Sequence, residues 1–148
     1  MTCRGAELIT SAEVIVSDAL VNPALLGIAP KNAEIIFAGK RSNLHTIPQD
    51  DLNRLLVNHA KAGKNVVRLK GGDPFLFGRG GEEAENLALC GVPFEVVPGV
   101  TSISAVPAYA GIPLTHRLFG STVTFITGHE DEQKLLSSVD WKRFAPGT

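Results

Sequence analysis

The residues best suited to chemistry form a glycine-rich turn after a short apolar run. Val66–Leu69, rich in β-branched residues, leads into Gly-Gly-Asp-Pro at positions 71–74. Glycines at the carboxyl end of a parallel strand let the backbone turn sharply and let a ligand approach the main chain. Asp73 can accept hydrogen bonds from ribose hydroxyls there, but a plain turn in which it bonds its own backbone fits equally well. The residues alone leave both interpretations open.

Two further clusters also lie where predicted strands end. Residues 98–102, Pro-Gly-Val-Thr-Ser, lead into a predicted helix whose free amides could face a ligand carboxylate. Capping of that helix by Thr101 alone is the commoner use of such a pattern. Asp18 follows the first predicted strand and Lys40 the second, so an acid and a base could exchange protons with a substrate at one sheet edge. A solvated surface pair is the default interpretation of those two.

Basic side chains near these turns could line a cleft for a polyanion, since guanidinium groups grip carboxylates in a bidentate manner. Scattered surface charge is the alternative. Nucleotide-phosphate binding has little support, because the chain lacks both GxGxxG and GxxxxGK[ST]. The four histidines show no spacing typical of zinc ligands, so we expect no metal. The basic residues in question are Lys40, Arg41, His45, Arg79, His116 and Arg117.

The elements that must position these residues alternate between β-branched runs and helical periods, which predicts an α/β fold with a parallel sheet flanked by helices. A domain covering residues 1–117 and the start of a second α/β domain over 118–148 are expected, with a strand at 121–127. Both ends look unfinished, because the chain starts inside a helix where a strand would be expected. We expect strands at 13–17, 34–37, 66–69 and 94–97, and helices at 5–12, 49–62 and 82–90.

Composition narrows the classes of partner. The formal net charge of −1 gives no general reason to bind nucleic acid or an anionic membrane. No apolar run approaches the ~20 residues of a membrane-spanning helix. Cys3 and Cys90 are far apart and lack CxxC spacing, which favours reduced thiols and a cytoplasmic location.

Three stretches resemble the tetrapyrrole methylase family, and specifically its uroporphyrinogen-III C-methyltransferase branch. They are residues 66–83, which contain Gly-Gly-Asp-Pro-Phe-Leu-Phe-Gly-Arg-Gly-Gly-Glu-Glu, residues 92–102, which contain Val-Pro-Gly-Val-Thr-Ser, and residues 108–117, which contain Gly-Ile-Pro-Leu-Thr-His-Arg. They occur in the family's order and at its spacing, which makes the match more specific than any single motif.

The resemblance implies a two-domain enzyme, usually a homodimer, that binds S-adenosyl-methionine between its domains. Such enzymes methylate two pyrrole carbons of uroporphyrinogen III to give precorrin-2, which feeds sirohaem and cobalamin synthesis. By the same resemblance, Asp18 matches the family's proposed proton acceptor and Lys40 its proposed proton donor. The cofactor contacts carried over from the family are Gly71, Gly72, Asp73, Leu76, Thr101 and Ser102.

The chain also departs from the family pattern. The family's Gly-Pro-Gly-Asp-Pro loop after its first strand would lie before Met1, and most of the second domain is absent. Two alternatives follow. One is a non-catalytic, truncated methylase half that acts as an interaction module, and the other is a methyltransferase for a later corrinoid intermediate. The full run from Phe77 to Glu83 argues against the second of these.

Overall fold

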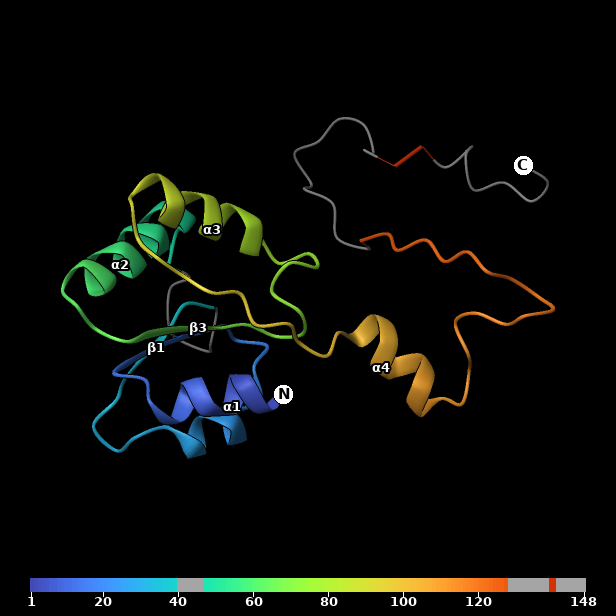
Figure 1. Cartoon of the computed structure of the whole chain (residues 1–148), viewed down its shortest axis with the longest axis horizontal. Helices are drawn as coiled ribbons and strands as arrows, with labels where there is room; N and C mark the ends of the chain where they lie inside the picture. The colour runs from blue at the N-terminus through green and yellow to red at the C-terminus, as the bar shows by residue number, and fades with distance from the viewer. Residues whose placement is uncertain (40–46, 128–138, 141–148) are drawn as a thin grey trace. The chain divides into compact units, whose positions relative to one another are not determined.

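The computed structural model describes residues 1–39, 47–127 and 139–140. The chain divides into two compact units, Met1–Ala105 and Val106–Thr148. The first unit is an α/β arrangement in which helices flank a parallel sheet, as the sequence predicts (Figure 1). The expected domain boundary after residue 117 stays a prediction.

The sheet of the first unit has three parallel strands in the order β2-β1-β3. The strands are β1 (Val14–Ser17), β2 (Glu34–Phe37) and β3 (Val66–Leu69). Ser17 lies opposite Phe37 on one side and Leu69 on the other. The three strands therefore end level with one another, and the loops that follow β1 and β3 emerge at the same edge.

The two faces of the sheet are covered by different helices, because side chains alternate between faces along each strand. On one face, buried Val14 and Val16 pack with Leu52 and Leu56 of α2 (Gln49–Lys61) and with Leu87 of α3 (Gly80–Leu89). Figure 1 shows these two helices together on one side of the strands. Each fully buried aliphatic side chain contributes about 1.5–3 kcal/mol.

The opposite face packs on α1 (Cys3–Thr10) and the 3-10 helix η1 (Pro23–Ile28). Buried Ile15 of β1 meets Ile9 and Ala12 there, and Leu26 packs against the same cluster. β1 is the best-buried strand, since all four of its residues are buried. Asp18 directly follows this central strand and so lies at the carboxyl end of the sheet.

The first three predicted helices and the three strands of the sheet begin and end within two residues of the bounds that the sequence predicts. Gly63, at φ 78°, occupies the left-handed position after α2 and so closes that helix, as its residue type indicates. The helix expected at 82–90 begins at Gly80, and the one expected at 5–12 begins at Cys3. The last helix within the described ranges, α4, spans Ser102–Tyr109.

Two predicted strands are wrong. Residues 94–97 form no strand; this segment and β3 both line a cavity of about 720 Å³, and β3 pairs only with β1 among the described residues. Residues 121–127 form no strand either. In both cases the alternation of apolar residues predicts an extended backbone. A strand also needs a neighbouring strand to pair with, and the pattern of the segment itself does not indicate whether one is present.

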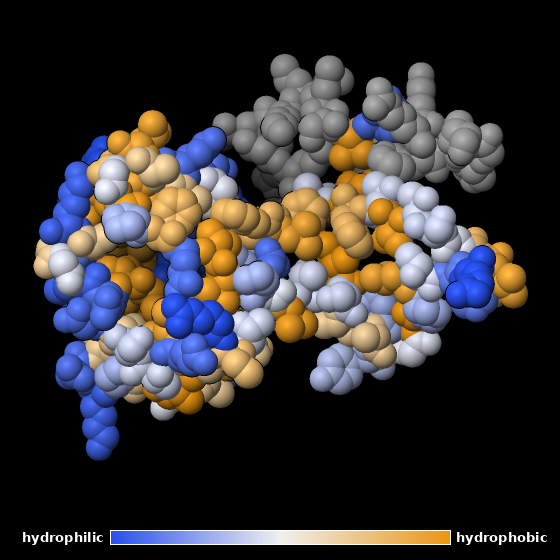
Figure 2. All heavy atoms as spheres, in the orientation of Figure 1, coloured by the Kyte–Doolittle hydropathy of each residue, from blue (hydrophilic) through white to orange (hydrophobic). Residues whose placement is uncertain are grey.

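In the described part of the second unit, the only β-type pairing is an antiparallel bridge between His116 and Gly120. Tyr109, Leu118 and Phe119 are strongly exposed. Within the first unit, Figure 2 shows apolar residues reaching the surface among hydrophilic ones; Phe75 and Phe77 are among those exposed. No helix in the described ranges is long and apolar enough to cross a membrane.

Candidate functional site

Three loops of the first unit come together at the carboxyl ends of the strands. A Cβ added to Gly71, after β3, would lie 3.4 Å from the Cβ of Leu20, in the loop after β1. A Cβ added to Gly99 would lie 1.9 Å from the carbonyl oxygen of Gly72 and 3.2 Å from the Cα of Asp73. The Gly-Gly-Asp-Pro turn therefore lies between the loop after β1 and the 98–102 cluster.

Asp73 joins two of these loops through its carboxylate. Its Oδ1 accepts a hydrogen bond from the main-chain N–H of Phe75 at 2.9 Å, which closes a local turn. Its Oδ2 accepts one from the N–H of Gly99, also at 2.9 Å. The hydrogen bond to Phe75 agrees with the interpretation of Asp73 as an ordinary turn residue. The hydrogen bond to Gly99 is a long-range contact that no sequence pattern predicts.

The close approach of the two turns requires glycine at specific positions. Gly72 has φ 74°, in the left-handed region that favours glycine. Gly99 has no room for a side chain, because its Cβ would overlap the Gly72 carbonyl. Gly80, at the start of α3, is equally restricted, since its Cβ would lie 1.8 Å from the carbonyl oxygen of Pro74. The 71–80 segment is thus held at both of its ends by backbone packing.

The other predicted cofactor contacts lie on the same two segments. The N–H of Leu76 donates to the carbonyl of Asp73 at 3.3 Å, and the Leu76 side chain is partly buried. Thr101 caps α4, with its Oγ1 accepting from the N–H of Ile103 at 3.3 Å. Ser102 is the first residue of α4 and is exposed. The capping interpretation of Thr101 is confirmed; a ligand contact by either hydroxyl stays a prediction.

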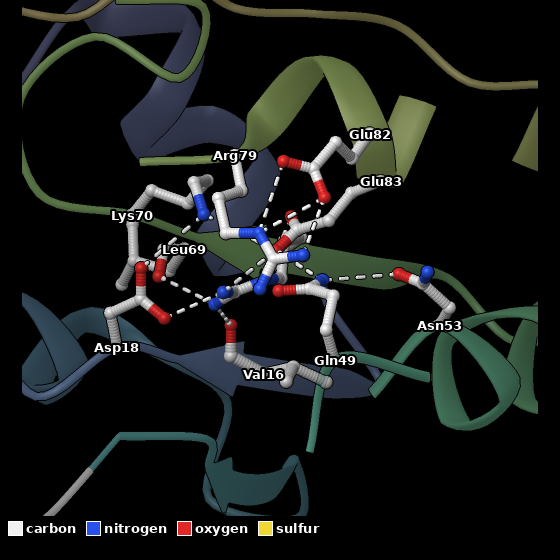
Figure 3. Close-up of polar contacts among 10 residues, drawn as sticks. Val16, Asp18, Gln49, Asn53, Leu69, Lys70, Arg79, Glu82 and Glu83 are labelled. Atoms are coloured by element: carbon white, nitrogen blue, oxygen red, sulfur yellow. Dashed lines mark hydrogen bonds and ion pairs between the residues drawn. The ribbon is translucent and has the colours of Figure 1, made fainter. Parts of the chain in front are cut away.

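Asp18 lies in a buried ionic cluster, which we call the Asp18 cluster, formed with Arg68, Lys70 and Glu83. Its Oδ1 accepts from Nη2 of Arg68 at 2.6 Å, and its Oδ2 lies 3.5 Å from Nζ of Lys70. Figure 3 shows Asp18, which follows β1, and Lys70, which follows β3, turned toward Glu83 of α3. The Asp18 side chain keeps 28% of its exposure, against 14% or less for the other three. Asp18 is therefore the member of the cluster most open to solvent or substrate.

Sequence reasoning missed Arg68, Lys70 and Glu83. The available signal was the alternation of Arg68 and Lys70 at the end of a strand that is otherwise apolar, which places two cations on one face. Buried cations need acidic partners, so that pattern calls for carboxylates on neighbouring elements. The pair Glu82-Glu83 looks like a solvated helix start, and only the fold shows that Glu83 points inward.

The residues leading into α3 adopt an unusual backbone. Phe77, Gly78 and Arg79 are consecutive left-handed residues, with φ values of 61°, 66° and 63°. For the two that are not glycine, this conformation costs about 1–2 kcal/mol each. Arg79 is anchored by Glu82, which accepts from its Nε at 3.0 Å. That exposed hydrogen-bonded pair lowers the pKa of Glu82 and raises the pKa of Arg79.

Part of the predicted site lies outside the described residues. Lys40, the expected proton donor, is among these, as are Arg41 and His45. Where the structure does describe the chain, no group of three or more His, Cys, Asp or Glu side chains is arranged to hold a metal ion. Cys3 and Cys90 are free thiols.

Comparison with known proteins finds relatives that match nearly the whole chain. The family model for Tetrapyrrole (Corrin/Porphyrin) Methylases matches residues 1–145. The S-adenosyl-L-methionine-dependent uroporphyrinogen III methyltransferase of Methanosarcina barkeri is 57% identical over 98% of this chain and 57% of its own length. The siroheme synthase of Methylococcus capsulatus is 52% identical over 97% of this chain and 30% of its own length.

A solved structure from the same family of enzymes also matches this chain. The uroporphyrin-III C-methyltransferase of Thermus thermophilus, complexed with S-adenyl homocysteine, is 44% identical with a TM-score of 0.63. That match covers 79% of this chain and 44% of the other. The chain thus spans a little over half of the Methanosarcina relative and less than half of the other two proteins.

Proposed function

We propose that this chain, which belongs to the tetrapyrrole (corrin/porphyrin) methylase family, binds S-adenosyl-methionine and takes part in the C-methylation of uroporphyrinogen III to precorrin-2. The observation that carries the proposal is the junction of the Gly-Gly-Asp-Pro turn with the 98–102 segment. The two segments lie in two of the stretches that resemble uroporphyrinogen-III methyltransferases, and Asp73 holds them together.

The turn fits a cofactor of this kind. Gly71 and Gly72 are exposed and carry no side chain, so a ligand can approach their main chain. Their amides donate to no other described residue and are available to a bound molecule. Asp73 uses one acceptor site on each oxygen for the backbone, and an ionised carboxylate has about four. It can therefore also accept from ribose hydroxyls.

The reaction needs few protein groups. S-adenosyl-methionine supplies a methyl group already activated by its sulfonium, so no serine or cysteine nucleophile is required. The electron pair of a pyrrole carbon forms the new C–C bond while the S–CH₃ bond electrons remain on sulfur. The methylated ring must then lose a proton. The protein's tasks are alignment of the two reactants and removal of that proton.

Asp18 is the proposed proton acceptor and Lys40 the proposed proton donor. Asp18 is supported by its place at the carboxyl end of the central strand and by its partial exposure beside the Gly71 loop. Lys40 rests on the family resemblance alone. The substrate carries eight carboxylates, and exposed basic residues such as Arg79 are proposed to bind them.

Methyl transfer is tested directly by incubating the 148-residue chain with ¹³C-methyl-labelled S-adenosyl-methionine and uroporphyrinogen III. The expected result is label on two ring carbons of the product, and loss of transfer in Asp18→Asn with cofactor binding retained. Binding of cofactor without transfer by the wild-type chain would favour a non-catalytic half. Absence of both would overturn the proposal.

A homodimer and a cytoplasmic location are part of the same proposal. The homodimer is supported by the family resemblance, and the location by the two widely spaced free thiols. Sedimentation equilibrium of the chain tests the first. A monomer at all concentrations would contradict it for this chain.

A further inference from the structure

We propose that Glu83 is a positioning residue that holds the Asp18 carboxylate in place through Arg68 and Lys70. The inference rests on the proposed function, because it gives Asp18 its role in proton removal. It goes beyond that proposal by assigning a task to a buried acid on α3 that no cofactor or substrate contact explains.

Glu83 is almost completely buried, with 5% of its surface exposed, and is surrounded by donors. Its Oε2 accepts from Nε of Arg68 at 3.1 Å. Its Oε1 accepts from Nη2 of the same guanidinium at 3.1 Å and from Nζ of Lys70 at 3.2 Å. Gln49 of α2 donates to that oxygen at 3.4 Å. Both oxygens are thus engaged, and two of the donors are cationic.

Arg68 is held by contacts on all three of its nitrogens. Nε and Nη2 form the two-pronged contact with Glu83, which fixes the plane of the guanidinium. Nη1 donates to the main-chain carbonyls of Val16 at 3.2 Å and Leu69 at 3.4 Å. Nη2 also donates a hydrogen bond to Oδ1 of Asp18 at 2.6 Å. Glu83 thus fixes one edge of the guanidinium while the same Nη2 group donates to Asp18.

Like Arg68, Lys70 lies between Glu83 and Asp18, but it contacts the second carboxylate oxygen of Asp18. Its Nζ lies between Oε1 of Glu83 at 3.2 Å and Oδ2 of Asp18 at 3.5 Å, and its side chain keeps only 7% of its exposure. The Asp18 cluster therefore contains two cations and two anions. Removing the charge of Glu83 leaves two buried cations to share one carboxylate, so Arg68 and Lys70 must shift relative to Asp18.

The neighbouring acids on α3 do not share this position. Glu82 is exposed and pairs with Arg79, and Glu85 is exposed on the same helix. Glu85→Gln removes one negative charge from the same helix without touching the cluster. It is the matched control for Glu83→Gln, which keeps the size of the side chain and removes its charge.

The experiment compares the wild-type chain, Glu83→Gln, Glu83→Asp and Glu85→Gln. Calorimetry with S-adenosyl-homocysteine gives the affinity, and initial rates with uroporphyrinogen III give kcat and KM. We expect kcat to fall on the order of 10²-fold in Glu83→Gln, as for a misplaced reacting group, with cofactor affinity changed by less than about 2-fold. Glu83→Asp should recover part of kcat, and Glu85→Gln should match the wild type.

A second readout does not depend on activity. In ¹⁵N NMR spectra, the Nε–H of Arg68, assigned by its loss in Arg68→Lys, should exchange slowly with solvent in the wild-type chain. It should become fast in Glu83→Gln and stay slow in Glu85→Gln. A fast-exchanging Arg68 Nε–H in the wild type overturns the inference even if Glu83→Gln fails to fold.

The remaining outcomes separate the inference from the proposed function. An inactive wild-type chain that binds no cofactor contradicts the proposed function, while the NMR result still decides whether Glu83 fixes Arg68. An active wild type with unchanged kcat in Glu83→Gln overturns the positioning role alone. Parallel loss of kcat and cofactor affinity in a folded Glu83→Gln would assign Glu83 a general structural role instead.

Discussion

Gly99 and Gly72 are in backbone contact: a Cβ on Gly99 would lie 1.9 Å from the carbonyl oxygen of Gly72. This contact joins two turns that are far apart in sequence: Asp73 of the first and Gly99 of the second are 26 positions apart. It makes the proposed cofactor site a property of paired loops and not of the Gly-Gly-Asp-Pro turn alone. Replacing Gly99 should push the two loops apart, whereas replacing Gly72 should strain its left-handed backbone without a clash.

Gly99→Ala is therefore expected to weaken S-adenosyl-homocysteine binding by at least 10-fold. It should also destabilise the chain by about 1–3 kcal/mol, the usual cost of overpacking. Calorimetry and urea denaturation measure the two effects. Gly81→Ala is the control, because a Cβ there meets nothing within 4 Å and Gly81 lies in α3. It should be neutral or slightly stabilising; equal effects of the two substitutions would contradict the contact.

Asp73→Ala removes both backbone hydrogen bonds of that carboxylate. We expect the free energy of unfolding to fall by about 1.5–3 kcal/mol, since the lost bonds involve a charged acceptor. Asp73→Asn keeps one oxygen acceptor and should lose less. Urea denaturation with intrinsic fluorescence measures both. Unchanged stability in Asp73→Ala would mean that the Gly99 amide does not depend on Asp73.

The Asp18 cluster should show strong coupling between Arg68 and Glu83. Arg68→Met alone leaves Glu83 buried with one cation fewer, and we expect a loss of about 3–5 kcal/mol. Combining it with Glu83→Leu removes both charges and should cost less than the sum of the single changes. A coupling energy below about 0.5 kcal/mol in the double-mutant cycle would contradict the contact.

The Glu82–Arg79 pair should stabilise the chain only where Glu82 is ionised. Its hydrogen bond to Arg79 lowers the pKa of Glu82 from the ordinary 4.5. The contribution is thus fully present above that ordinary value and is lost as the pH falls through the lower folded-state pKa. Glu82→Gln should lower Tm slightly at pH 6, as expected of a surface pair, and leave it unchanged near pH 2. A difference that grows in acid would contradict this sign.

The sequence predicts the strands β2 and β3 and the end of α2 at Gly63, because β-branched runs and a left-handed glycine are local signals. It fails for residues 94–97, whose extended backbone would need a neighbouring strand to form a ladder. Strand pairing depends on residues that are far away in the sequence, so it cannot be predicted from the composition of the segment alone.

The site divides in the same way. The positions of Asp18, the glycine turn and Thr101 were predictable because each follows or precedes a local element, and their roles stay predictions. The Asp18 cluster was not, since Glu83 reaches Arg68 only when α3 packs on the face of β3 that carries it. The bond from Asp73 to Gly99 was equally hidden, because it links turns that only the fold brings together.

The most direct test of the central claim is calorimetric titration of the wild-type chain and Asp73→Ala with S-adenosyl-homocysteine. Paired loops that form a cofactor site predict micromolar binding by the wild type and none detectable in Asp73→Ala. Glu85→Gln, on the exposed side of α3, should bind as the wild type does. No heat from the folded wild-type chain, or equal binding by Asp73→Ala, would contradict the account.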